Sequence, residues 1–297
     1  MDQEMFGKTA GWMKRNARPL ECARWEYLFE EGPKEAVMQK LSAFQHNDGG
    51  FGHSLEPDSM LPESNSIDTW TACQILMEVE ADSDELIVQT AMDYLMQSYD
   101  REKGLWKTVI PEHNNHPRAP WWSYTEEAQD NWMYNPSVEL AAYLIHWSEE
   151  ESDSYNLGLE VMERATIHLM NSSGMDFHEV NNFQRAYEIT GDAPEEAKAK
   201  LNELIEASID TDPESWGKSY KALPLDMIAG KDHGLYDKYT ELIEKNTEYL
   251  KEAVNSEGVW NITWEWGQYE EEYHVAKQQW KGIMAVTNWK VLREFDQ

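Results

Sequence analysis

Hydrophobic residues recur with the period of an α-helix along most of the chain, and almost no segment alternates with the period of a strand. Some segments carry one apolar stripe and one charged face, which predicts helices that cover a core. Others are apolar on nearly every side, which predicts helices surrounded by protein. The first kind spans about 33–46, 84–98, 154–170, 195–209 and 235–254. The second kind spans Ile67–Val79, Val138–Trp147 and Tyr220–Ala229, together with the aromatic-rich segments 17–30, 177–190 and 276–294.

The two kinds of segment alternate along the sequence, inner then outer. This order predicts an all-α fold, an α/α toroid of about six helical hairpins in which a ring of inner helices is wrapped by a ring of outer helices. Met5–Met13 supplies a further outer position. Proline at 33 and 136 and the capping-box spacing of Asp192 and Glu195 agree with the expected helix starts. No linker divides the chain, so residues 1–297 are expected to form a single domain.

A degenerate repeat follows the outer helices, because each of them ends in a turn that leads to an aromatic residue. The aromatic residues are Phe51, Trp106, Phe177, Trp216 and Trp260. Two of the turns, Gln45–Phe51 and Gln97–Trp106, place a glutamine, then glycine, then the aromatic.

These two turns resemble the QW repeats of the terpenoid cyclase and protein prenyltransferase superfamily, the α-α toroids. The chain also resembles bacterial proteins described as prenyltransferase-like. The resemblance implies a toroid with a central cavity and an isoprenoid-like ligand. The other three turns keep the aromatic residue but lack the glutamine, so the motif is specific only over the first third of the chain.

The connections that lead from an outer helix to the next inner helix are long, at about 46–65, 99–134, 171–176 and 255–275. In a toroid all of these connections lie at one end, together with the N-termini of the inner helices. Long loops on a rigid scaffold commonly carry function. A candidate site is therefore expected at this end.

Aromatic residues gather in these loops, within a chain that holds 14 tryptophans. Indoles around carboxylates can stabilise positive charge or stack on sugar rings. The expected ligand-binding residues are Trp106, Trp121, Trp122, Tyr124, Trp260, Trp264 and Trp266. The alternative is that these rings only fill the mouth of the barrel.

Asp68 is the expected catalytic acid, with Glu56 and Asp58 as nearby carboxylates that could share acid and base roles. Asp68 lies in the first turn of an inner helix, where the class II cyclases carry their acidic motif. Ser66-Ile-Asp68-Thr69 keeps only the middle aspartate of that motif. The diphosphate-binding motif and the zinc residues of the superfamily are missing, so the expected ligand has no diphosphate and no cofactor. The alternative is that Asp68 only stabilises the helix dipole.

His113 and His116 have the spacing of a metal-ligand pair, but they lie in a Pro/Asn-rich loop. A helix would place both side chains on one face, and this loop does not. We therefore expect a surface loop and no metal site.

The net charge of the chain limits the kinds of molecule that the protein is expected to bind. Acidic residues number 56 and basic residues 25, giving a net charge of -31 that would repel nucleic acid. No apolar run approaches membrane-spanning length, and residues 1–15 lack the apolar region of a secretory signal, so a cytoplasmic location is expected. The two cysteines exclude a disulfide framework.

Three functions remain open. The first is an enzyme or binding protein for an apolar, isoprenoid-like ligand in an aromatic and acidic cavity, with acid catalysis as one option. The second is a carbohydrate-active α/α barrel, a glycoside hydrolase, lyase or epimerase, which would use paired carboxylates. The third is a non-catalytic scaffold that binds a partner protein. Whether the protein is an enzyme, and its oligomeric state, stay open.

Overall fold

The computed structural model describes residues 3–218 and 220–295, and within them it contains helices and isolated β-bridges but no strand. The predicted all-α fold class is confirmed in this sense. The chain divides into two compact units. Unit 1 comprises Met1–Lys40, Ile205–Glu265 and Glu270–Gln297, and unit 2 comprises Leu41–Leu204 and Trp266–Tyr269. Closure of the helices into a toroid, and the single domain over 1–297, stay predictions.

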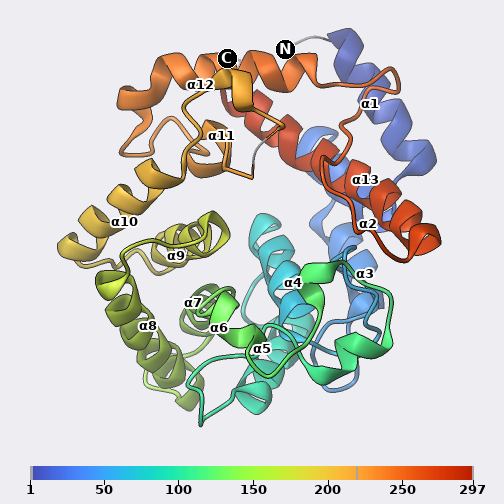
Figure 1. Cartoon of the computed structure of the whole chain (residues 1–297). Coiled ribbons are helices and arrows are strands. Elements are labelled where there is room, and N and C mark those ends of the chain that lie inside the picture. Colours follow the sequence, from blue (N-terminus) through green and yellow to red (C-terminus); the bar gives the residue numbers. More distant parts are fainter. Residues whose placement is uncertain (1–2, 219, 296–297) are drawn as a thin grey trace. The chain divides into compact units, whose positions relative to one another are not determined.

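Unit 2 is built around α7, which is buried on nearly every side. Its helices are α4 (Ser66–Glu78), α5 (Leu86–Ser98), α6 (Ala128–Trp132), α7 (Ser137–Trp147), α8 (Asp153–Asn171), α9 (Phe177–Thr190) and most of α10 (Glu195–Ser208), with the 3-10 helices η1 (Ser42–Phe44), η2 (Pro111–Asn115) and η3 (Pro120–Trp122). Helix α7 packs against α4, α5, α8 and α9 (Figure 1). Helix α8 instead buries a single stripe that includes Leu157, Val161, Ala165 and Leu169. This difference confirms the two kinds of helix that the hydrophobic pattern predicts.

Unit 1 has an aromatic core. Its helices are α1 (Gln3–Asn16), α2 (Pro19–Phe29), nearly all of α3 (Lys34–Leu41), α11 (Pro224–Met227), α12 (Tyr236–Glu252) and α13 (Glu270–Phe295), with the 3-10 helix η4 (Pro213–Ser215). The Phe6 ring lies 5.1 Å from Trp25 and 5.1 Å from Trp289. The Trp289 indole donates to Thr9 Oγ1 at 3.0 Å, so the large ring is buried with its N–H satisfied.

The prediction of an inner helix over Tyr220–Ala229 is wrong. Only Pro224–Met227 is helical, and Tyr220 is exposed. Proline lacks a backbone N–H and clashes with the preceding turn, so a helix can begin at Pro224 but cannot run through it. The backbone N–H of Leu225 is used instead by Asn246 Oδ1, at 2.9 Å.

The repeated turn aromatics secure helix ends. The indole N–H groups of Trp106, Trp216 and Trp260 donate to the carbonyls of Leu95, Asp210 and Leu250 at 2.8, 2.9 and 2.8 Å. The last carbonyls of a helix have no partner within the helix, so each indole supplies one at or just beyond the end of the helix before it. In the turn Gln45–Phe51, Gln45 Nε2 donates to Ile87 O and to Thr90 Oγ1. Gly49 in the same turn has a positive φ of +90, and a side chain there would collide with Thr90.

Among the residues that the structure describes, no helix combines the length and the apolarity that a membrane crossing requires.

Candidate functional site

Buried helices of both units share an acidic residue at their third position. These residues are Glu21 of α2, Asp68 of α4, Glu139 of α7, Glu179 of α9 and Asp226 of α11. The first turn of a helix has free N–H groups and the positive end of the dipole, which together stabilise a carboxylate. Of the five, only Asp68 was predicted from the sequence. The sequence signal that could have found the others is a triplet at the helix start whose third residue is acidic. The five triplets are Pro-Leu-Glu, Ser-Ile-Asp, Ser-Val-Glu, Phe-His-Glu and Pro-Leu-Asp.

Glu139 is fully buried and joins three helices of unit 2. Its Oε1 accepts from Tyr143 Oη at 2.5 Å and from Gln74 Nε2 of α4 at 3.0 Å. Its Oε2 accepts from Asn182 Nδ2 and from Arg185 Nε of α9, both at 2.9 Å. These donors fill the lone-pair positions of a carboxylate. Glu139 therefore holds side chains of three helices in place.

Arg185 is the side chain that this arrangement presents to solvent, with 36% of it exposed. Its Cζ lies 5.8 Å from the centre of the Trp70 ring. Only Nε is used by Glu139, and the two terminal nitrogens make no hydrogen bond to a residue that the structure describes. We call Trp70, Gln74, Asn182 and Arg185 the Arg185 face. Figure 1 shows that α4, α7 and α9, which supply this face and Glu139, are neighbours.

Two further atoms of the Arg185 face lack hydrogen-bond partners. Asn182 Oδ1 and Trp70 Nε1 are buried and make no hydrogen bond within the described residues. A buried polar atom without a partner costs free energy. Such atoms are typical of sites that water or a ligand completes. The Arg185 face was not predicted from the sequence.

The structure brings together the three predicted catalytic carboxylates in unit 2. Asp68 Oδ1 accepts the Glu56 N–H at 2.7 Å, and Asp68 Oδ2 accepts Asn65 Nδ2 at 2.9 Å. Glu56 Oε1 accepts the Asp58 N–H at 3.3 Å, and Asp58 Oδ1 accepts the indole of Trp266 at 2.9 Å. All three carboxylates are buried. We call Glu56, Asp58, Asp68 and Trp266 the acidic loop cluster.

The second long loop lies against this cluster. The Ala119 N–H donates to Asp58 O at 2.8 Å, which places Trp121, Trp122 and Tyr124 nearby in the chain. Trp122 is buried and stacks on Trp132 at 4.8 Å. Trp121 is 38% exposed, and the backbone of Tyr124 bonds the side chain of Asn114.

The remaining predicted ligand-binding residues are Trp106, Trp260 and Trp264. Trp106 in unit 2 and Trp260 in unit 1 are buried, with their N–H groups at helix ends. Trp264 in unit 1 is half-buried and meets Trp280 edge-on at 5.2 Å. A ligand-binding role for these residues stays a prediction.

His113 is not on the surface, contrary to the expectation for its loop. Its ring is buried, and Nδ1 lies 3.1 Å from the backbone nitrogen and 3.1 Å from the backbone oxygen of Ile110. Burial lowers the pKa of His113 to about 4. His116 Nε2 lies 3.7 Å from Glu63. In the part of the chain that the structure describes, no group of three or more histidine, cysteine or acidic side chains is arranged to hold a metal.

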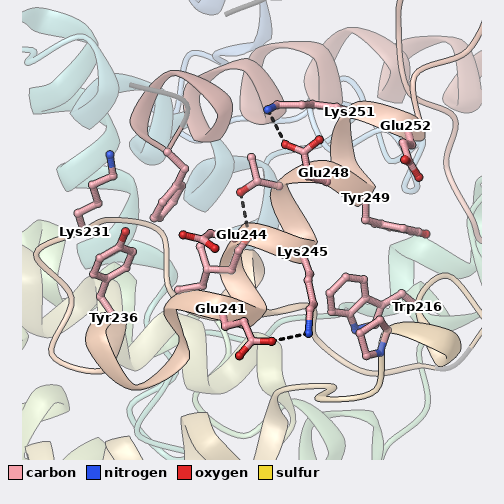
Figure 2. A pocket seen from close by; sticks show the side chains of 14 residues that line it. Trp216, Lys231, Tyr236, Glu241, Glu244, Lys245, Glu248, Tyr249, Lys251 and Glu252 are labelled. Atoms are coloured by element: carbon pink, nitrogen blue, oxygen red, sulfur yellow. Dashed lines mark hydrogen bonds and ion pairs between the residues drawn. The ribbon is translucent and has the colours of Figure 1, made fainter.

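Unit 1 has an open recess of about 790 Å³ along α12 (Figure 2). Trp216, Tyr236 and Tyr249 supply its aromatic lining. Charged side chains in it pair with one another, since Lys245 bonds Glu241 at 2.7 Å and Lys251 bonds Glu248 at 2.8 Å. The predicted site residues all belong to the described part of the chain, and none of them lines this recess.

A comparison of the chain with family models, with curated proteins and with solved structures gives no match. The resemblance to the terpenoid cyclase and prenyltransferase superfamily therefore stays a prediction.

Proposed function

We propose that this protein binds a small hydroxylated carboxylate, an acidic sugar, on the Arg185 face of unit 2. One observation carries the proposal. The guanidinium of Arg185 is fixed by Glu139 at 2.9 Å and lies near the Trp70 ring, while its terminal nitrogens have no partner within the described residues. A guanidinium held in this way is preorganised for a ligand and loses little side-chain entropy on binding.

The guanidinium selects the charged group of the ligand. Its terminal N–H groups form a planar fork that matches a carboxylate or a phosphate with two parallel hydrogen bonds. The net charge of -31 opposes ligands with several negative charges more strongly than ligands with one. A single carboxylate therefore fits best, in agreement with the missing diphosphate motif.

Two amide oxygens indicate that the ligand also carries hydrogen-bond donors. Asn182 Oδ1 is buried without a donor, and Gln74 Oε1 accepts no hydrogen bond within the described residues, while both amide nitrogens donate to Glu139. These oxygens need hydrogen-bond donors, which hydroxyl groups supply and an isoprenoid chain does not. The half-buried ring of Trp70 offers an apolar face on which a sugar ring can stack.

This proposal favours the carbohydrate alternative over the isoprenoid one, and binding over acid catalysis. The oxygens of Glu139 are filled by donors, and Glu56, Asp58 and Asp68 are buried within hydrogen bonds. Acid catalysis by these carboxylates stays a prediction, and no step through them is part of the proposal.

A titration of the full chain with galacturonate at pH 7, followed by calorimetry, tests the proposal. Galactose is the matched neutral sugar, and farnesoic acid with farnesol is the matched apolar pair. A hydrogen bond to a charged group contributes about 1.5–3 kcal/mol, so galacturonate should bind about tenfold or more tightly than galactose. Tight binding of farnesoic acid without binding of galacturonate would favour the isoprenoid prediction and contradict the acidic sugar.

Two variants locate the site. Arg185→Gln keeps a polar side chain but removes the charged fork, and it should weaken galacturonate binding by about tenfold or more. Arg101→Gln is the matched control, because Arg101 is an exposed arginine of the same unit and lies outside the Arg185 face. Equal binding by both variants would show that the carboxylate is bound elsewhere.

A further inference from the structure

A second cluster in unit 2 contains an oriented imidazole. Glu179 is buried at the third position of α9, and its Oε1 accepts the Tyr134 N–H at 3.0 Å. His168, in the last turn of α8, places Nε2 at 3.2 Å from the same oxygen. The negative charge of a carboxylate at this distance favours the ring proton on Nε2. In that tautomer Nδ1 keeps its lone pair.

Nδ1 of His168 is available to a solvent molecule or ligand. It makes no hydrogen bond to any residue in 3–218 or 220–295 that the structure describes, and 23% of the side chain is exposed. A buried carboxylate 3.2 Å from Nε2, together with an Nδ1 that has no protein partner, is the arrangement of a general base.

Two phenols lie in the same region. The Tyr134 ring is 5.3 Å from the His168 ring. The Tyr99 hydroxyl is buried and has no hydrogen-bond partner in the described part of the chain. Burial raises the pKa of Tyr99 and of Tyr134, so both hydroxyls keep their protons at neutral pH and remain donors.

We propose that His168 is a general base, positioned by Glu179, for the hydrolysis of small uncharged esters. In this step Nδ1 takes a proton from water, and the water oxygen forms a bond to the acyl carbon. The bond between that carbon and the alcohol oxygen breaks, the alcohol or its anion leaves, and the carboxylic acid is released. The imidazolium then returns the proton to solvent. This inference is independent of the Arg185 face.

Hydrolysis of 4-nitrophenyl acetate by the full chain at neutral pH tests the proposal. General base catalysis contributes about a hundredfold or more, so His168→Asn should remove nearly all of the protein-dependent rate. His146→Asn is the matched control, since His146 is an exposed histidine of the same unit. A rate that His168→Asn leaves unchanged, or that both variants lower equally, would overturn the proposal.

Nitrogen-15 NMR of the wild-type histidines gives a second readout that needs no variant. The proposal requires the neutral His168 ring to carry its proton on Nε2. Glu179→Gln keeps an acceptor oxygen for the Tyr134 N–H but removes the charge, so it should lower the rate and allow the proton to populate Nδ1. A wild-type ring protonated on Nδ1 would contradict the proposal whatever the rates are.

Discussion

Asp68 and Glu139 occupy the same position of two buried helices in unit 2, and both are fully buried, yet their surroundings differ. Asp68 is bonded by the Glu56 backbone and by Asn65, so it fastens a loop to the start of α4. Glu139 is bonded by side chains of α4, α7 and α9. One carboxylate secures the chain that precedes its own helix, and the other orients an arginine of a neighbouring helix toward solvent.

The difference shows that the position of an acidic residue in a helix does not decide its role. The third position stabilises a carboxylate in both cases, through the free N–H groups and the dipole of the first turn. The role depends on the donors that the carboxylate meets. Asp68 accepts from a backbone N–H and an asparagine, whereas Arg185 extends the network of Glu139 to a group with unused hydrogen-bond donors.

The largest effect is expected for Glu139→Leu. This change leaves Tyr143, Gln74 and Asn182 without their acceptor and Arg185 without its charge partner. Each buried donor left without its acceptor costs about 1–3 kcal/mol, and the partly exposed Arg185 adds less. Urea unfolding of the variant and of the wild type should show this loss. A loss of unfolding free energy smaller than that of Asp68→Asn would mean that Glu139 stabilises the fold less than Asp68 does.

The effect of His113 on the pH dependence of stability tests whether water reaches the interior of the second long loop. Its pKa is lowered from 6.5 to about 4 by burial, so the folded state resists a proton that the unfolded state accepts. The stability that depends on the neutral ring is present above pH 6.5 and is lost as the pH falls toward 4. The loss is roughly 3 kcal/mol in full. His113→Gln should lack this part of the pH dependence between pH 7 and pH 4.5, as urea unfolding at several pH values would show.

An identical pH dependence in the wild type and in His113→Gln would indicate that water reaches the His113 ring. The second loop would then not be packed as tightly as its buried contacts indicate.

A smaller effect is expected for Asp68→Asn. The new side chain keeps an oxygen for the Glu56 N–H but turns an amide toward Asn65, and it removes the charge at the helix start. The loss of one capping interaction and its charge corresponds to about 1–2 kcal/mol. Thermal unfolding measures the loss, with Asp93→Asn as a control at an exposed aspartate of the same unit. A loss of stability larger than that of Glu139→Leu would mean that Asp68 stabilises the fold more than Glu139 does.

How much the sequence predicts depends on the separation between partners. The donors Glu56 and Asn65 lie 12 and 3 positions from Asp68, so these two contacts are visible in one stretch of sequence. Glu139 has a local partner in Tyr143, but its other donors lie 65, 43 and 46 positions away, and no local pattern connects them. Helix positions are local too, and the segment 177–190 is both predicted and found as α9. The helix predicted over Tyr220–Ala229 is too long, because the prediction gave its apolar content more weight than Pro224.

The separation between partners also explains why the contacts of the tryptophans were not predicted. Trp106 and Trp260 belong to a visible repeat, but their N–H groups bond carbonyls of the helix before them, which the repeat alone does not reveal. Trp70 lies in a predicted inner helix, and nothing in its sequence indicates that Arg185 lies over its ring.

Galacturonate binding by Glu139→Gln and by Asp68→Asn, measured by calorimetry at pH 7, tests the central claim most directly. Both changes replace a buried third-position acid by its amide. If Glu139 orients Arg185 for a carboxylate, Glu139→Gln should weaken binding about tenfold or more, while Asp68→Asn should leave it within about twofold. Equal binding by the two variants would contradict the claim.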